Sequence, residues 1–198
     1  IGDYSFRVCT SLKSVIIGSG VTNLSLSAFL GCSSLESIIV AEENTTYTSG
    51  NGANCIIEIS TNDLILGCKN TTMPNNVKGI GTYAFFNCTG LTSIAIPNGV
   101  TWIGISAFDG CTGLTEITIP ESVTIIHDFA FYKCSSLTSI TIPNSVTYFG
   151  RDVFSYTYLF NNANDGDLIY VSRADGKRWL LGYKTIFDGN LIISDDVI

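Results

Sequence analysis

Residues 103–125 read IGISAFDGCTGLTEITIPESVTI, and residues 126–148 read IHDFAFYKCSSLTSITIPNSVTY. The two stretches align without a gap, and the same pattern recurs along most of the chain. One column of this pattern is always Phe, at positions 6, 29, 85, 108, 131 and 154. The steps are 23, 56, 23, 23 and 23 residues, and 56 is 23 plus an insertion of 33. A fixed period of this length is typical of repeat architectures.

The other recurrent columns are mainly apolar. Each unit opens with an aliphatic or aromatic residue, has Ala-Phe-x-x-Cys in its middle in most copies, and continues as Leu-x-x-Ile-x-Ile-Pro in the later copies. A unit of 23 residues cannot bury its own apolar side, so neighbouring units must stack and share one core. We therefore predict a single solenoid domain over residues 1–198, with repeats that start near residues 1, 24, 80, 103, 126 and 149.

The spacing inside one unit predicts a mostly β solenoid. The apolar residues of Leu-x-x-Ile-x-Ile alternate at the end of the run, as in a strand with one buried face, and Pro ends that strand. The following Val-Thr-x-Ile-Gly run predicts a second short strand. The Ala-Phe-x-x-Cys segment is too short for a stable helix and predicts a single 3-10 or helical turn.

This pattern resembles the BspA-like (Treponema pallidum type) leucine-rich repeat of bacterial surface proteins. Residues 1–40 and 73–154 carry the resemblance, together with the fragment 191–198. The resemblance implies a right-handed, curved superhelix, display at the cell surface or secretion, and a protein-binding or adhesive role. It also implies a protein partner from the host's extracellular matrix or plasma.

Two segments interrupt the repeat. The first insertion, about 41–72, contains two apolar runs around residues 60–63, which predicts a β-hairpin. A two-residue loop at Thr61-Asn62 would place Ile59 opposite Leu64 and Cys55 opposite Cys68. The second insertion, about 155–190, contains apolar runs on either side of an Asp-Gly tip, again a hairpin pattern. Residues 191–197 re-enter the repeat, so we expect the chain to be an excerpt of a longer repeat protein.

Composition excludes several classes of protein. Hydrophobic residues make up 45% of the chain and charged residues 14%, which is unlike a disordered chain. The apolar runs are far shorter than the roughly 20 residues of a membrane-spanning helix, so we expect no membrane insertion of this segment. The net charge of −7 and the pI near 4.5 make nucleic acid a poor partner.

The cysteines have two different expected roles. Five of the seven occupy the repeat's Cys column, and parallel side chains about 4.8 Å apart do not converge as a disulfide requires. We expect these five to be reduced core thiols. Cys55 and Cys68 either form a cross-strand disulfide in an exported protein or remain free, and the sequence leaves both open.

No recognised catalytic motif is present in the sequence. His127 takes a column that is otherwise Gly or Ser, and without a partner at matched spacing we interpret it as a surface residue at a turn. Zinc is disfavoured because there is no Cys-x-x-Cys and only one His. We therefore expect no enzyme activity, no cofactor and no metal site.

The candidate functional surface is the side of the Leu-x-x-Ile-x-Ile run that faces away from the core. It consists of two columns. The first carries Lys13, Glu36, Thr92, Thr115 and Thr138, and the second carries Ile16, Ile39, Ala95, Thr118 and Thr141. The pair Ile16 and Ile39 is either an apolar contact patch or is covered by a neighbouring rung or the first insertion. We predict a non-enzymatic protein-binding or adhesion module, with a structural spacer or the recognition arm of a larger surface enzyme as alternatives. The oligomeric state is left open.

Overall fold

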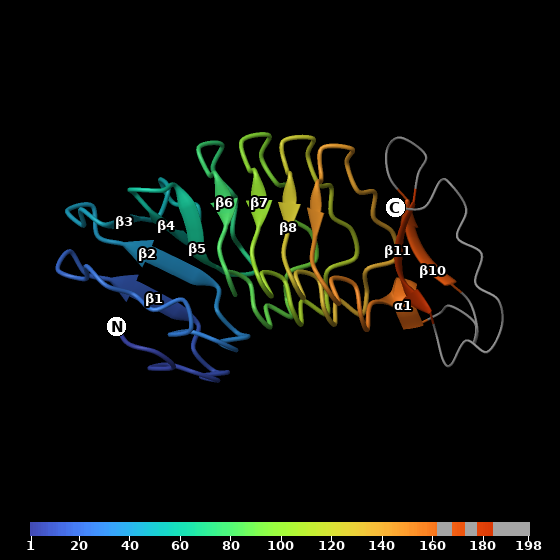
Figure 1. Ribbon diagram of the computed structural model, residues 1–198. Helices are drawn as coiled ribbons and strands as arrows, with labels where there is room; N and C mark the ends of the chain where they lie inside the picture. Colours follow the sequence, from blue (N-terminus) through green and yellow to red (C-terminus); the bar gives the residue numbers. More distant parts are fainter. Residues whose placement is uncertain (162–167, 173–177, 184–198) are drawn as a thin grey trace.

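The computed structural model describes residues 1–161, 168–172 and 178–183, and within them the chain forms a solenoid of stacked rungs (Figure 1). The expected leucine-rich-repeat solenoid, mostly β with almost no helix, is confirmed. Successive rungs lie side by side, and the N-terminal rung lies at one end of the stack. In the described residues no helix is long and apolar enough to cross a membrane.

A seven-stranded sheet forms one side of the solenoid. Its last four members are two-residue strands from the Val-Thr-x-Ile-Gly run, paired in parallel at a constant register. The sheet order is β3 (Tyr47–Thr48), β4 (Cys55–Glu58), β5 (Asp63–Gly67), β6 (Gly79–Ile80), β7 (Trp102–Ile103), β8 (Ile125–Ile126) and β9 (Tyr148–Phe149).

The Leu-x-x-Ile-x-Ile run forms regular strands only in the first two rungs. There β1 (Ser14–Ile17) and β2 (Ser37–Val40) pair in parallel over four residues. In the later rungs the run forms no regular strand and has isolated bridge residues instead, such as the pair Ala95 and Thr118. The prediction of a strand in every unit was therefore wrong for the later ones. Backbone hydrogen bonds hold these rungs together instead at β6–β9 and at the turns, for example from the Gly104 amide to the Ile80 carbonyl at 2.8 Å.

The Ala-Phe-x-x-Cys segments form hydrogen-bonded turns around a column of stacked rings. Ring centroids of Phe85, Phe108, Phe131 and Phe154 follow one another at 5.0, 5.3 and 5.4 Å, and all four rings are buried. Backbone amides of each turn donate hydrogen bonds to carbonyls of the next rung; the Phe85 amide, for example, donates to the Ala107 carbonyl at 2.7 Å. The turns therefore fix the distance between rungs along this edge.

The first insertion is a hairpin that becomes part of the solenoid. β4 and β5 are antiparallel, which confirms the hairpin, but Cys55 pairs with Gly67 and Ile57 with Leu64 across a bulge. The predicted register was wrong because the connection spans residues 59–62, with the Asn62 amide bonded to the Glu58 carbonyl at 2.8 Å. β5 must also align in parallel with β6, and this alignment places Leu64 beside Ile80.

The inserted hairpin separates two hydrophobic cores. Cys55, Ile57 and Leu64 pack into the large core of the later rungs. Ile56 and Ile65 pack into the smaller core of the first two rungs. Because side chains alternate along a strand, one hairpin can complete both cores at once.

The second predicted hairpin is confirmed in its described part. After a single helical turn, α1 (Tyr158–Asn161), the strands β10 (Leu168–Ser172) and β11 (Arg178–Tyr183) pair antiparallel. Its Asp-Gly tip and the predicted return to the repeat at 191–197 lie outside the described residues.

Candidate protein-binding surface

The predicted surface is solvent-accessible along five rungs. We call it the outer strand face; it consists of Lys13, Ile16, Glu36, Ile39, Thr92, Ala95, Thr115, Thr118, Thr138 and Thr141. Nine of these ten residues are exposed and Glu36 is half-buried. The Leu and Ile side chains of this run point into the core, which leaves these two columns outward. Whether the face binds a partner stays a prediction.

Two isoleucines dominate the N-terminal part of this face. Ile16 and Ile39 are register partners in β1 and β2, and they are 71% and 48% exposed. The first insertion therefore leaves both accessible. Large apolar side chains that remain exposed next to one another often mark contact sites.

The first insertion is tied to this face through Glu36. Lys69 places its Nζ atom 2.8 Å from Glu36 Oε1, and this hydrogen-bonded cation lowers the pKa of Glu36. Asn70 also donates from Nδ2 to the Glu36 carbonyl at 3.1 Å. The insertion thus borders the face at one edge.

A groove of about 560 Å³ lies beside Ile39. Its walls are β2 and the inserted segment, including Asn51 and the 45%-exposed Ile59. This volume lies within the range of roughly 300–1,000 Å³ seen for binding pockets. The inserted segment therefore forms a groove beside a strand face that would otherwise be flat.

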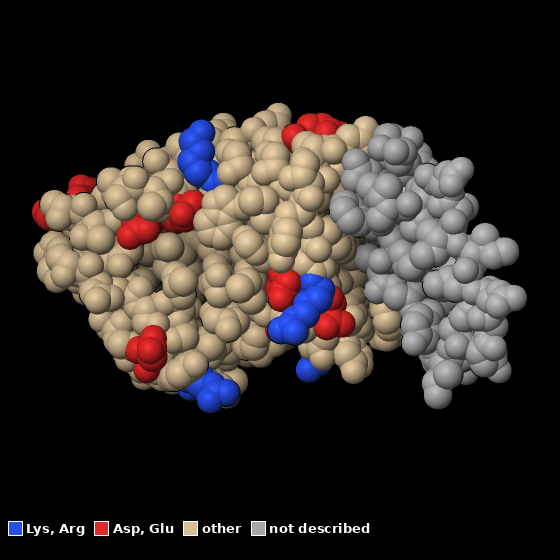
Figure 2. All heavy atoms as spheres, in the orientation of Figure 1, with Lys and Arg blue, Asp and Glu red and all other residues tan. Residues whose placement is uncertain are grey.

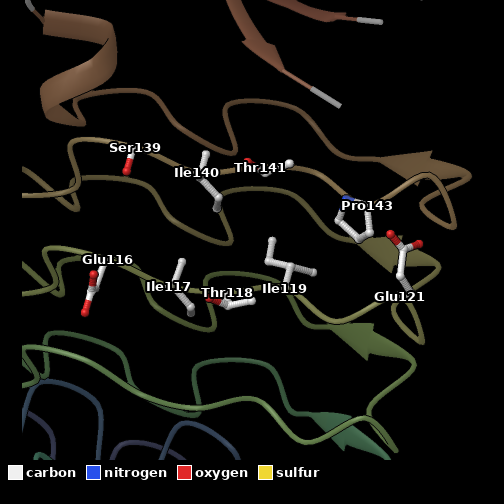
Figure 3. Close-up of a pocket in the computed structure, with 9 residues that line it drawn as sticks. All are labelled: Glu116, Ile117, Thr118, Ile119, Glu121, Ser139, Ile140, Thr141 and Pro143. Atoms are coloured by element: carbon white, nitrogen blue, oxygen red, sulfur yellow. The ribbon is translucent and has the colours of Figure 1, made fainter. Parts of the chain in front are cut away.

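A second hollow, of about 360 Å³, lies between two later rungs and includes Thr118 and Thr141 (Figure 3). In this part of the described chain, no backbone hydrogen bond joins residues 117–119 to 140–142. The nearest such contact is a long one, from the Thr138 amide to the Thr115 carbonyl at 3.5 Å. Between these two rungs, the peptide groups without such a bond and the exposed hydroxyls of Thr118 and Thr141 are therefore available to solvent or to a partner.

Four of the five column cysteines are buried, as predicted, whereas Cys9 is exposed. The buried thiols of Cys32, Cys111 and Cys134 donate to Phe carbonyls of the preceding rung at 3.1–3.2 Å. All column cysteines are free thiols in the structure. The four buried cysteines therefore serve the core, and the prediction of a core role was wrong for Cys9.

Cys55 and Cys68 are both buried free thiols here. Burial, and secondarily the charge of Cys68, raise the pKa of Cys55 to about 12. Cys68 instead lies within 3.5 Å of the Asn54 carbonyl, as a donor from Sγ. The disulfide between the two stays a prediction. In the observed register Cys55 is opposite Gly67, so the two cysteines are not direct cross-strand partners.

His127 lies in an aromatic strip that was not predicted. Its ring centroid is 6.3 Å from Trp102 and 5.6 Å from Tyr148 on the two neighbouring rungs. The imidazole is half-buried, and His127 lies directly before a turn, with its carbonyl accepting from the Ala130 amide at 3.3 Å. The signal was present in the sequence, since the three residues lie within two columns of one another in successive units.

The described part of the surface carries few charges. Figure 2 shows the acidic and basic side chains of one face as small, separated groups. One of the two salt bridges within the described residues joins Arg151 to Asp128 at 3.1 Å. Shape and hydrogen bonding, more than long-range attraction, must therefore govern any contact.

The family model described as BspA type leucine-rich repeat region matches residues 1–62 and 64–169, with six copies. The chain belongs to this family. BspA-type repeats thus account for the columns and the solenoid described above. The repeat family suggests a protein-interaction module and indicates no catalytic family.

Solved structures of several bacterial proteins share the fold. The pneumococcal vaccine antigen PcpA is 23% identical with a TM-score of 0.69, over 94% of this chain and 50% of that protein. A leucine-rich cell surface protein from Faecalibacterium prausnitzii A2-165 is 27% identical, with a TM-score of 0.56 over 82% of this chain and 48% of that one. A leucine-rich repeat protein from Bacteroides ovatus is 26% identical, with a TM-score of 0.53 and coverage of 79% and 44%.

The chain therefore spans about half the length of these structural relatives. No curated protein matches its sequence.

Proposed function

We propose that this BspA-type repeat chain is a protein-binding module of a bacterial cell-surface or secreted protein. The observation that carries the proposal is the outer strand face, whose two columns stay accessible over five rungs and include the adjacent Ile16 and Ile39. Family membership and the described cell-surface protein from Faecalibacterium prausnitzii support an extracellular location. The partner is a protein, and a host extracellular or plasma protein fits a module displayed in this way.

Binding begins at the isoleucine pair. Two exposed branched side chains at register positions present a continuous apolar area, and their burial by a partner removes this area from water. A side chain of the partner can insert into the groove beside Ile39. The Thr columns of the later rungs offer hydroxyl groups for hydrogen bonds around that centre.

The test is a capture experiment from host extracellular fluid, followed by affinity measurement with the captured protein. We expect Ile16→Ser together with Ile39→Ser to weaken binding at least about tenfold, since two apolar contacts are replaced by polar groups. Leu26→Ser is the matched control, because Leu26 is also an exposed apolar residue, 44% accessible, outside the outer strand face.

Two results would contradict the proposal. Equal losses from the double variant and from Leu26→Ser would mean that the outer strand face is not the contact. Failure of the isolated chain and of a longer parent chain to retain any protein would favour the alternative of a structural spacer.

A further inference from the structure

A different hollow, of about 510 Å³, lies across the turns of several rungs. These turns form the edge of the solenoid at which α1 begins (Figure 1). We call it the aromatic hollow and define it by Tyr83, Phe86, Ile105, Asp109, Phe129 and Tyr132. It shares no residue with the outer strand face. Four of its six members are aromatic, and Ile105 is 42% exposed.

The rings of the aromatic hollow are held in fixed orientations. Tyr83 and Phe86 meet edge to face with centroids 5.7 Å apart, and Phe129 and Tyr132 do the same at 5.5 Å. The first residue of each pair has a left-handed backbone, with φ of 63° and 59°. Two such pairs, separated by one rung, present rigid aromatic surface at little further entropic cost on binding.

The polar group of the aromatic hollow is the carboxylate of Asp109. Asp109 is half-buried, and this burial raises its pKa, while a hydrogen bond with the Ser106 side chain and the charge of Lys133 oppose the rise. Within the described part of the chain Asp109 forms no salt bridge. A partly desolvated carboxylate without an ion pair gains more from an added cation than an exposed one does.

Cations already lie on ring faces around this rim. Lys133 Nζ is 5.2 Å from the centroid of Tyr132, the Arg151 guanidinium carbon is 5.2 Å from that of Phe129, and that of Arg7 is 5.5 Å from Tyr4. Each of these contacts lies within the cation–π range of about 6 Å. The rings of this edge thus accept positive charge.

We propose that the aromatic hollow binds an arginine side chain of a partner protein. A planar guanidinium can stack on an aromatic face and at the same time donate two hydrogen bonds to one carboxylate, which an ammonium group cannot do. The guanidinium would lie between the aromatic pairs and pair with Asp109. The proposed function supplies the protein partner, and the site itself is defined independently of the outer strand face.

The test uses small probes, so that it does not depend on capture of a partner. N-acetyl-arginine amide and its neutral analogue N-acetyl-citrulline amide are titrated into the isotope-labelled chain, and backbone amide shifts are followed. We expect the arginine probe to shift amides of the aromatic hollow with half-saturation in the millimolar range, and the citrulline probe to shift them at least about fivefold less at equal concentration.

Single substitutions test whether the Asp109 charge and the Tyr132 ring contribute to binding of the arginine probe. Asp109→Asn should weaken the arginine probe at least about fivefold, and Tyr132→Leu should weaken it while keeping apolar bulk. Glu121→Gln is the matched control, because it removes the same charge from an exposed position on another face and should leave binding unchanged. A melting curve for each variant checks folding.

Three outcomes would overturn the proposal. They are equal shifts with both probes, unchanged affinity in folded Asp109→Asn, and shifts spread over acidic residues elsewhere. Loss of partner binding through Ile16 and Ile39 variants alone leaves these shifts in place, so the two proposals fail separately.

Discussion

At the scale of single residues, every described turn of the repeat carries at least one residue with a left-handed backbone just before Cys or its equivalent. Gly31 and Gly110 occupy this position with φ of 76° and 74°, but Val8 and Lys133 occupy it too, with φ of 58° and 56°. A β-branched residue is strained there by roughly 1–2 kcal/mol. The two glycines indicate a left-handed backbone in this column, but the other units have residue types that rarely adopt it, so the sequence does not predict it for every turn.

Val8→Gly should therefore stabilise the chain. Val8 is 59% exposed, so little packing is lost, and the relieved strain exceeds the added flexibility of the unfolded chain. We expect the free energy of unfolding in urea to rise by about 0.5–1 kcal/mol. Thr112→Gly, at an exposed position without positive φ, should instead lower it. A loss at Val8 as large as at Thr112 would show that the turn is unstrained.

The buried thiols make stability depend on alkaline pH. Burial raises the pKa of Cys88 and Cys134 to about 12 from an ordinary value of 9.0. The unfolded chain thus releases these protons first as pH rises, so the thiols stabilise the fold fully below pH 9 and progressively less towards pH 12. We expect the free energy of unfolding to fall over this window, with a shallower slope in Cys134→Ala. Identical slopes in both proteins would contradict this account.

At the scale of elements, the inserted hairpin shows what sequence patterns could and could not predict. The two apolar runs predicted strands correctly, because alternation is a local property. The register depended on β6, which pairs with β5 in parallel and is remote from the hairpin's own turn. Counting residues across the turn therefore placed Cys55 opposite the wrong residue. The weaker hydrogen bonding of the later rungs was also missed, although Pro97, Pro120 and Pro143 stand where the first two units have Gly18 and Ala41, and Pro has no amide to donate.

Gly67 is the position where the hairpin meets the Phe column. A Cβ atom on Gly67 would lie 2.1 Å from the Phe85 ring, which has no room to move within the stacked column. Gly67→Ala should lower the free energy of unfolding by about 1–3 kcal/mol, the usual cost of overpacking. Gly20→Ala, with open space around it, should have little effect. Equal unfolding midpoints for the two variants would mean that the hairpin packs differently.

Hydrogen exchange should distinguish the two sides of the later rungs. The amides of Thr124, His127 and Gly150 are bonded to the preceding rung at 2.8–2.9 Å. The amides of Ile140 and Thr141 have no such bond to residues 117–119 of the preceding rung, so we expect them to exchange faster. Uniform protection on both sides would contradict the open rungs described above.

At the scale of the whole molecule, the period of 23 residues predicted the solenoid and the accessible columns of the outer strand face, and the resemblance of the repeat pattern indicated the family. The aromatic strip around His127 and the aromatic hollow were missed because both arise between rungs, from columns whose residue type changes from unit to unit. Repetition reveals what every unit shares, whereas these surfaces depend on what single units change. Function in such a chain therefore has to be sought in the departures from the repeat.

The most direct test of the binding proposal is hydrogen exchange of the chain alone and with the protein it captures. We predict that binding slows exchange in residues 13–17 and 36–41, which carry Ile16 and Ile39, and extends to the later rungs at 138–141. Protection confined to the turns, or to β6–β9 on the opposite side, would contradict the outer strand face as the contact.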